Sequence, residues 1–73
     1  MYTVTTNAGT DGQWVPAYEL GRFPSKGLAW EVALREAEKW IGCNGEVMWD
    51  YPLGIIRAWR YPVGGALWLV LEI

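Results

Sequence analysis

One segment of this chain has the periodicity of an α-helix, whereas the segments on either side of it alternate like β-strands. The apolar side chains of the helical segment fall within an arc of about 140° when successive residues are placed at helical spacing. They are Ala29, Trp30, Ala33, Leu34, Ala37, Trp40 and Ile41. Ser25 is suited to cap the N-terminus of this helix, and Gly42 is suited to end it. We therefore expect one amphipathic helix, whose alanines let it approach a sheet closely.

Five further segments have the alternation or the β-favouring composition of strands. Two precede the helix and three follow it, over residues 2–6, 13–20, 46–51, 55–61 and 66–73. Turn-forming residues separate them at Asp11-Gly12, Pro52-Leu53-Gly54 and Pro62-Val63-Gly64-Gly65. Pro16 cannot donate a hydrogen bond to a neighbouring strand, so the second segment is expected at a sheet edge, or broken at the proline.

The last segment is apolar on both of its sides, which is typical of a central or doubly covered strand. One side carries Leu67, Leu69, Leu71 and Ile73, and the other carries Trp68 and Val70. The order ββαβββ predicts a single α+β domain over residues 1–73. We expect its one helix to pack on a four- to five-stranded, mainly antiparallel sheet, with a meander after the helix.

Aromatic side chains are more numerous than a small core needs. The chain has six Trp, four Tyr and one Phe among 73 residues, and a chain of this size buries only about 60% of its unfolded surface. A single helix covers only one face of such a sheet. If the aliphatic rows pack on the helix, the opposite face carries a belt of Trp49, Tyr51, Arg57, Trp59, Tyr61 and Trp68. Trp, Tyr and Arg are enriched at binding hot spots, so we expect these six residues to bind a partner.

Three interpretations of this belt remain open. It forms a homodimer with two sheets packed face to face, or it docks on a different protein, or the rings pack beneath the helix. The third arises because a shift of one residue in register exchanges the two faces of a strand. The terminal strand could alternatively pair with its copy along a sheet edge.

Catalytic chemistry is not expected from these residue types. The chain has no His, one Ser and one Cys, so it lacks the partners of a Ser-His-Asp or Cys-His site. A zinc site would need carboxylates alone, and we expect neither metal nor cofactor. Glu46, Asp50 and Glu72 could gather near strand ends, but solvated charges at such positions are far commoner. Cys43 has no second cysteine for an intramolecular disulfide and no His to activate it.

The charge balance favours protein partners over nucleic acid. The net charge is −2 and the isoelectric point is about 4.9, whereas phosphate-binding proteins usually show a basic stripe. A single-stranded nucleic-acid site remains the alternative, with Trp59 between Arg57 and Arg60 as its best candidate. The longest apolar run, residues 66–71, is far shorter than the roughly 20 residues that cross a bilayer. We expect a cytoplasmic protein without a membrane segment.

The segment Trp30-Glu31-Val32-Ala33-Leu34-Arg35-Glu36-Ala37-Glu38-Lys39-Trp40 and the three strands after it suggest a type of protein. A short acidic chain of this kind, without catalytic residues, resembles the small anti-CRISPR proteins of phages and mobile elements. The resemblance is architectural and transfers no functional residues. It implies inhibition of a CRISPR effector, with a type I surveillance complex, type I-C in particular, blocked from binding target DNA or recruiting its nuclease. A small subunit or antitoxin of a larger assembly is a further alternative.

Overall fold

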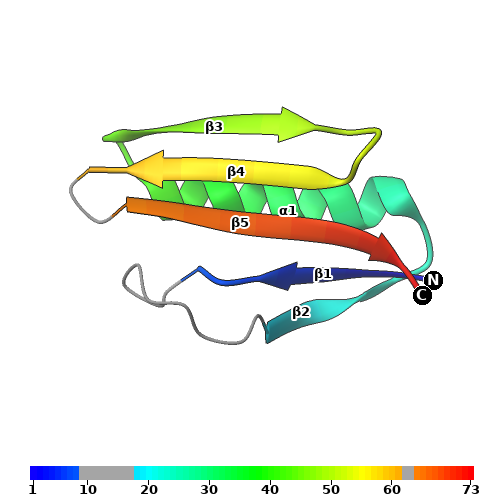
Figure 1. Cartoon of the computed structure of the whole chain (residues 1–73). Helices are drawn as coiled ribbons and strands as arrows, with labels where there is room; N and C mark the ends of the chain where they lie inside the picture. The colour runs from blue at the N-terminus through cyan, green and yellow to red at the C-terminus, as the bar shows by residue number, and fades with distance from the viewer. Residues whose placement is uncertain (9–17, 62–63) are drawn as a thin grey trace.

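The structure is a computed structural model, and it describes residues 1–8, 18–61 and 64–73. Its elements follow the predicted order ββαβββ (Figure 1). They are β1 (Tyr2–Thr6), β2 (Tyr18–Phe23), α1 (Lys26–Ile41), β3 (Gly45–Asp50), β4 (Ile55–Arg60) and β5 (Gly64–Glu72). The α+β class is confirmed: the helix forms one layer and a five-stranded sheet forms the other.

All neighbouring strands of the sheet are antiparallel, in the order β2-β1-β5-β4-β3. The meander after the helix is therefore confirmed, and so is the central position of the last strand. Because β1 and β4 occupy both sides of β5, the alternative in which the terminal strand pairs with its own copy is wrong. The second strand lies at an edge as expected, although residues 13–17, with Pro16, and the Asp11-Gly12 turn lie outside the described residues, as does the Pro62-Val63 part of the last turn.

Both predicted ends of the helix are confirmed. The Ser25 hydroxyl accepts a hydrogen bond from the Leu28 N–H at 3.2 Å, which satisfies one of the free donors of the first turn. Gly42 has a φ of 60° and donates its N–H to the Lys39 carbonyl at 3.3 Å. Positive φ at this position favours glycine and ends the helix. The chain enters α1 from one edge strand, β2, and leaves it toward the other, β3, and the helix lies over the middle of the sheet, behind β4 and β5 in Figure 1.

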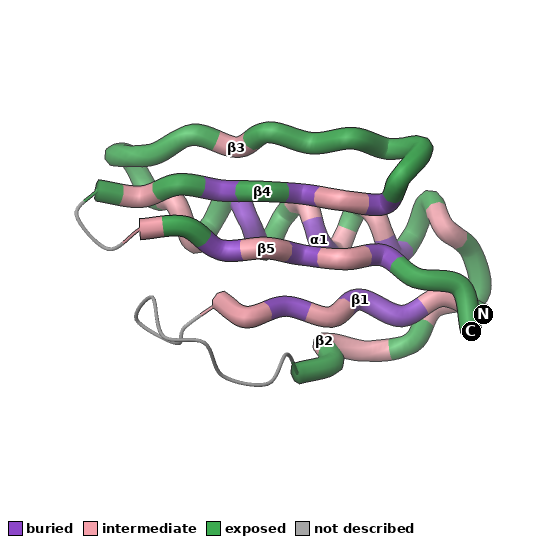
Figure 2. Tube along the Cα trace, viewed as in Figure 1, coloured by how far each residue is buried: buried purple, intermediate pink, exposed green. Residues whose placement is uncertain are grey.

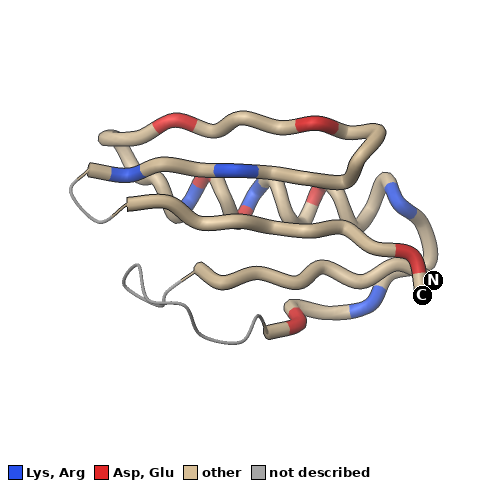
Figure 3. Tube along the Cα trace, in the orientation of Figure 1, with Lys and Arg blue, Asp and Glu red and all other residues tan. Residues whose placement is uncertain are grey.

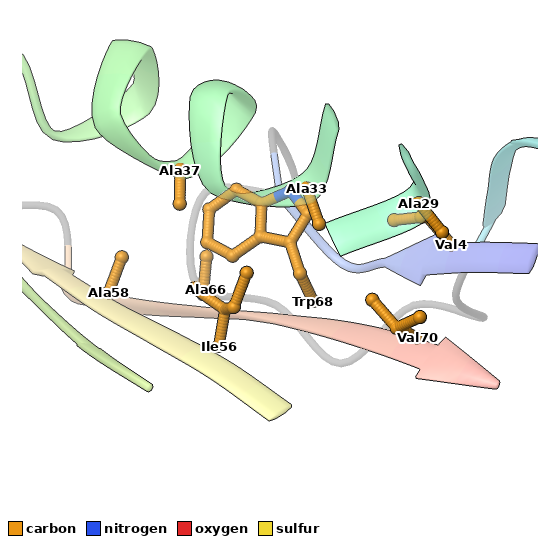
Figure 4. Close-up of a cluster of buried hydrophobic side chains, with 9 residues drawn as sticks. All are labelled: Val4, Ala29, Ala33, Ala37, Ile56, Ala58, Ala66, Trp68 and Val70. Atoms are coloured by element: carbon orange, nitrogen blue, oxygen red, sulfur yellow. The ribbon is translucent and has the colours of Figure 1, made fainter. Parts of the chain in front are cut away.

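The core lies between α1 and the middle of the sheet, where the tube of Figure 2 is purple. It consists of Val4, Ala29, Ala33, Ala37, Ile56, Ala58, Ala66, Trp68 and Val70. Figure 4 shows the Trp68 indole between β5 and the alanines of the helix. Five small alanines leave the space that this one large ring fills. Its buried indole N–H has no hydrogen-bond partner in the described part of the chain, so packing alone holds the ring in place.

The turn between β3 and β4 fixes how these two strands align. Gly54 has a φ of 71° and donates its N–H to the Tyr51 carbonyl at 3.0 Å. Its own carbonyl accepts from Val70 N–H at 2.8 Å, and a Cβ at this position would meet the Val70 backbone. Asp50 then pairs with Ile55 at the start of the ladder. Glycine is needed here both for its conformation and for the close approach of β5.

Candidate protein-binding face

Within residues 1–8, 18–61 and 64–73, no helix or further sheet covers the side of the sheet that faces away from α1, and we call this side the open face. Directly paired residues of neighbouring strands share a face, so the register assigns its members. They are Thr3, Thr5, Glu19, Arg22, Glu46, Met48, Asp50, Ile55, Arg57, Trp59, Gly65, Leu67, Leu69 and Leu71. The buried core residues of the same strands point the other way, toward the helix.

Aliphatic side chains form the middle of the open face. Leu67, Leu69 and Leu71 follow one another at every second position of the central strand, β5. Ile55 is the direct neighbour of Leu69 on β4, and Met48 lies one strand further out. The expectation that the aliphatic row of the last strand packs beneath the helix is therefore wrong. Small alanines and one indole fill the space beneath α1, and the leucine row is left on the uncovered side.

The structure divides the six residues of the predicted aromatic belt between both faces. Arg57 and Trp59 lie on the open face, with Tyr61 directly after β4. The rings of Trp59 and Tyr61 lie 6.1 Å apart, centroid to centroid, at an interplanar angle of 75°. Trp68 is only 1% exposed and lies in the core, so the prediction that it faces a partner with the others is wrong.

Trp49 and Tyr51 lie on the helix side of the sheet, which also differs from the predicted single belt. Their ring centroids lie 6.0 Å and 5.0 Å from that of Trp30 on α1, both in edge-to-face geometry. The Lys26 ammonium lies 4.5 Å from the centre of the Tyr51 ring. The third interpretation, rings packed beneath the helix, is thus correct for Trp68, whereas Trp49 and Tyr51 contact the side of the helix and stay exposed.

Register explains why the belt separates. Trp49 pairs with Ile56, so an odd-numbered position of β3 shares its face with an even-numbered position of β4. Alternation within each strand correctly groups Trp49 with Tyr51, and Trp59 with Tyr61. It does not specify which of these rows come together, because a shift of one residue exchanges the faces.

The open face is mixed in charge and carries more carboxylates than guanidinium groups. The open face carries three carboxylates, those of Glu19, Glu46 and Asp50, and two guanidinium groups, those of Arg22 and Arg57. Figure 3 shows acidic positions on β3 beside basic positions on β4. The Arg22 Nε atom donates to the Glu19 carboxylate at 2.9 Å. This hydrogen bond, with a second one from Thr3, lowers the pKa of the Glu19 carboxyl.

Arg60 does not join Arg57 beside Trp59. Its guanidinium lies on the helix side, 4.4 Å from the centre of the Trp40 ring, and donates to the Trp40 carbonyl at 2.7 Å. It therefore covers a ring at the end of the helix, as expected for a cation–π contact. In the predicted nucleic-acid site, Trp59 was placed between two arginines. Only Arg57 lies on the same face as this ring.

Sequence reasoning missed the aliphatic centre of the open face. Its members are Met48, Ile55, Leu67, Leu69 and Leu71. One signal for it was available, since β5 is apolar on both sides while the helix side offers mostly alanine. Within residues 1–8, 18–61 and 64–73, no group of three or more Cys, Asp or Glu side chains could hold a metal ion. The same ranges contain no helix that could span a membrane.

The described residues define a class: an α+β domain whose helix covers one face of the sheet and leaves the other, partly apolar face without a helix. Comparison of the chain with protein-family models, with curated proteins and with solved structures finds no match in any of the three.

Proposed function

We propose that this domain is a non-enzymatic binding protein whose open face docks on another protein, inside the cytoplasm. The observation that carries the proposal is the row Leu67, Leu69 and Leu71, partly to well exposed on the sheet face that α1 does not cover, beside the half-exposed Trp59. Contiguous apolar surface of this kind on a soluble domain marks an interaction site. A polar rim formed by Glu19, Arg22, Glu46 and Asp50 surrounds it, as at a typical interface.

The size of the face supports a specific interface. The two longer dimensions of the chain are 35 and 23 Å, so the projected area of the sheet face is at most about 800 Å². A standard-size complex buries about that area on each partner. The whole face, and not a single side chain, is therefore the unit that we expect to dock.

Substitution at the centre of the face tests this proposal. We expect Leu69→Glu to abolish partner binding, because it places a charge in the middle of the apolar row. Leu28→Glu is the matched control, since Leu28 is an exposed leucine on α1. Trp59→Ala should cost at least ~2 kcal/mol of binding if this ring is a hot spot. A folded Leu69→Glu protein that binds as tightly as the Leu28→Glu protein contradicts the proposal.

A second copy of the chain is the first partner to test. Two open faces can pack as aligned sheets about 10 Å apart, with β5 over β5. Light scattering on the purified protein should then give a dimer, which Leu69→Glu converts into a monomer. A monomer at every concentration tested would remove the homodimer and leave docking on a different protein.

For the different protein, we propose a CRISPR effector, in line with the anti-CRISPR resemblance of the chain. The domain would bind a subunit of a type I surveillance complex, type I-C in particular, and block its access to target DNA. The test is binding of target DNA by a purified type I-C complex, with and without the domain. Inhibition that saturates at a fixed ratio and is lost in Leu69→Glu supports the proposal; unchanged DNA binding excludes it.

The alternative function is binding of single-stranded nucleic acid. The row Arg57, Trp59 and Tyr61 favours it, because exposed rings beside a guanidinium can stack on bases. The carboxylates of Glu19, Glu46 and Asp50 on the same face oppose it. Oligonucleotide titration at two salt concentrations separates the two functions, since binding to phosphates weakens steeply with salt.

A further inference from the structure

A hollow of about 450 Å³ opens at the end of the sheet where β3 begins and β4 ends. Its lining residues are Cys43, Asn44, Gly45, Glu46, Trp59 and Tyr61. Two aromatic rings and one carboxylate are the groups in it with distinctive chemistry. Trp59 and Glu46 also belong to the docking face proposed above, but docking of the leucine row does not account for the hollow itself or for Tyr61 beside it.

The two rings form adjoining walls of the hollow. Their planes meet at 75°, and the residues Trp59 and Tyr61 are 49% and 69% exposed. Trp59 leans over Gly65 on β5, where its ring lies 3.3 Å from the position of a Cβ. The hollow opens beside this ring, and Gly45 and Glu46 at the start of β3 also line it. The Tyr61 N–H donates to the Asn44 carbonyl at 3.2 Å, which holds the second wall in line with β4.

A carboxylate lies beside these walls. Glu46 is the direct cross-strand partner of Trp59, and the Cβ atoms of such pairs are about 5 Å apart. No ion pair of Glu46 occurs within the described ranges. An exposed carboxylate next to two exposed ring faces gives the hollow a negative potential on several sides.

The basic side chains of the chain are placed elsewhere. Four of the six have contacts of their own: Arg22 with Glu19, Arg35 with Glu31, Lys26 with Tyr51 and Arg60 with Trp40. Lys39 lies on α1. Arg57 lines a different hollow, with Met48 and Asp50, further along the open face. No cation of the described residues therefore lines the hollow beside Trp59.

We propose that Trp59, Tyr61 and Glu46 form a binding site for a quaternary ammonium group. Cations of this class pack their methyl groups against ring faces and are attracted by the ring quadrupole. A primary ammonium is strongly hydrated, and one carboxylate in an open hollow does not replace that hydration. The group can come from a free ligand such as choline or from a trimethylated lysine of a protein.

The test is a titration of the whole protein, followed by the indole ¹H–¹⁵N signals in NMR. Choline should shift the Trp59 signal in a saturable way, with a dissociation constant in the millimolar range. The signal is assigned by its absence in Trp59→Phe, and the Trp68 signal is the internal control for folding. The neutral isostere 3,3-dimethylbutan-1-ol should bind at least about fivefold more weakly, since it lacks the charge.

Variants identify the contributing groups. Tyr61→Leu and Glu46→Gln should each weaken choline binding about two- to fivefold, whereas Glu36→Gln on α1 should leave it unchanged. Equal binding of the neutral isostere, absence of saturation, or full affinity in Tyr61→Leu would each overturn the proposal.

One peptide, compared with choline, then separates the sources of the ligand. A short trimethyl-lysine peptide that binds more tightly than choline assigns the site to a protein; equal affinities assign it to the free cation. These titrations need no docking partner. If choline does not bind, the protein-binding proposal is unaffected. If the domain docks on no protein, the cation site can still be tested by these titrations.

Discussion

The indole of Trp59 lies over Gly65, its direct partner on the neighbouring strand, and takes the space that a side chain at position 65 would fill. Glycine in the interior of a strand offers nothing to pack, and a cross-strand aromatic ring compensates for this. The same contact holds Trp59 on the open face with one side of the ring free. One side chain therefore covers a strand glycine and also belongs to both proposed binding sites.

Substitution of Gly65 tests this relationship. We expect Gly65→Val to push the Trp59 ring off β5, because even a Cβ would lie 3.3 Å from it. The free energy of unfolding should change by less than about 1 kcal/mol, since valine favours strands. The Trp59 indole NMR signal should move while the Trp68 signal stays. An unmoved Trp59 signal would show that the ring does not depend on Gly65.

The two tryptophans Trp68 and Trp49 should differ widely in their effect on stability. Trp68→Ala is expected to cost about 3–5 kcal/mol of unfolding free energy, because it empties the centre of the core. Trp49→Ala, at a residue 61% exposed on the edge strand β3, should cost less than about 2 kcal/mol. Urea unfolding measures both. Equal losses would place Trp68 outside the core and contradict the face assignment.

The glycines at positions 54 and 42 form a matched pair. Both have positive φ, so alanine at either position introduces backbone strain of about 1–3 kcal/mol. A Cβ at Gly54 would also meet the Val70 backbone, whereas the space around Gly42 is open. Gly54→Ala should therefore destabilise the protein clearly more than Gly42→Ala in thermal unfolding. The reverse order would rule out the close approach of the β3–β4 turn to β5.

The pair Glu19 and Arg22 predicts a dependence of stability on pH. The hydrogen bond from Arg22 lowers the pKa of the Glu19 carboxyl in the folded state. Its stabilising effect is thus fully present above the ordinary pKa of glutamate and is lost as the pH falls through the lower, folded-state value.

Replacement of Arg22 tests the direction of this pH dependence. Arg22→Met should lower the melting temperature slightly at neutral pH, and the difference from the parent protein should disappear in acid. High salt should also reduce it, because both groups are exposed. A difference that persists below the pKa of the folded state would mean that Arg22 acts through packing of its aliphatic stem.

Much of the fold follows from patterns within single segments. The spacing of Ala29, Ala33 and Ala37, with Ser25 and Gly42 at the ends, predicted the helix correctly. The apolar sides of the last strand predicted its central place, and the turn at Pro52-Leu53-Gly54 predicted the meander. Each of these features depends on neighbours in the chain, so local sequence contains the information.

The register between strands and the space beneath the helix decided which residues lie on the open face. Trp49 and Trp59 have the same alternation in their strands, yet the pairing of Asp50 with Ile55 across the turn places them on opposite faces. Trp68 and Leu69 are adjacent and both apolar, and only the space beneath a helix rich in alanine selects the indole for the core. The alternation within a strand stays the same when that strand shifts by one residue against its neighbour. The shift does change which residues are hydrogen-bonded and which side chains fill the core. Tertiary packing therefore decided which rings remain exposed on the open face and which are buried in the core.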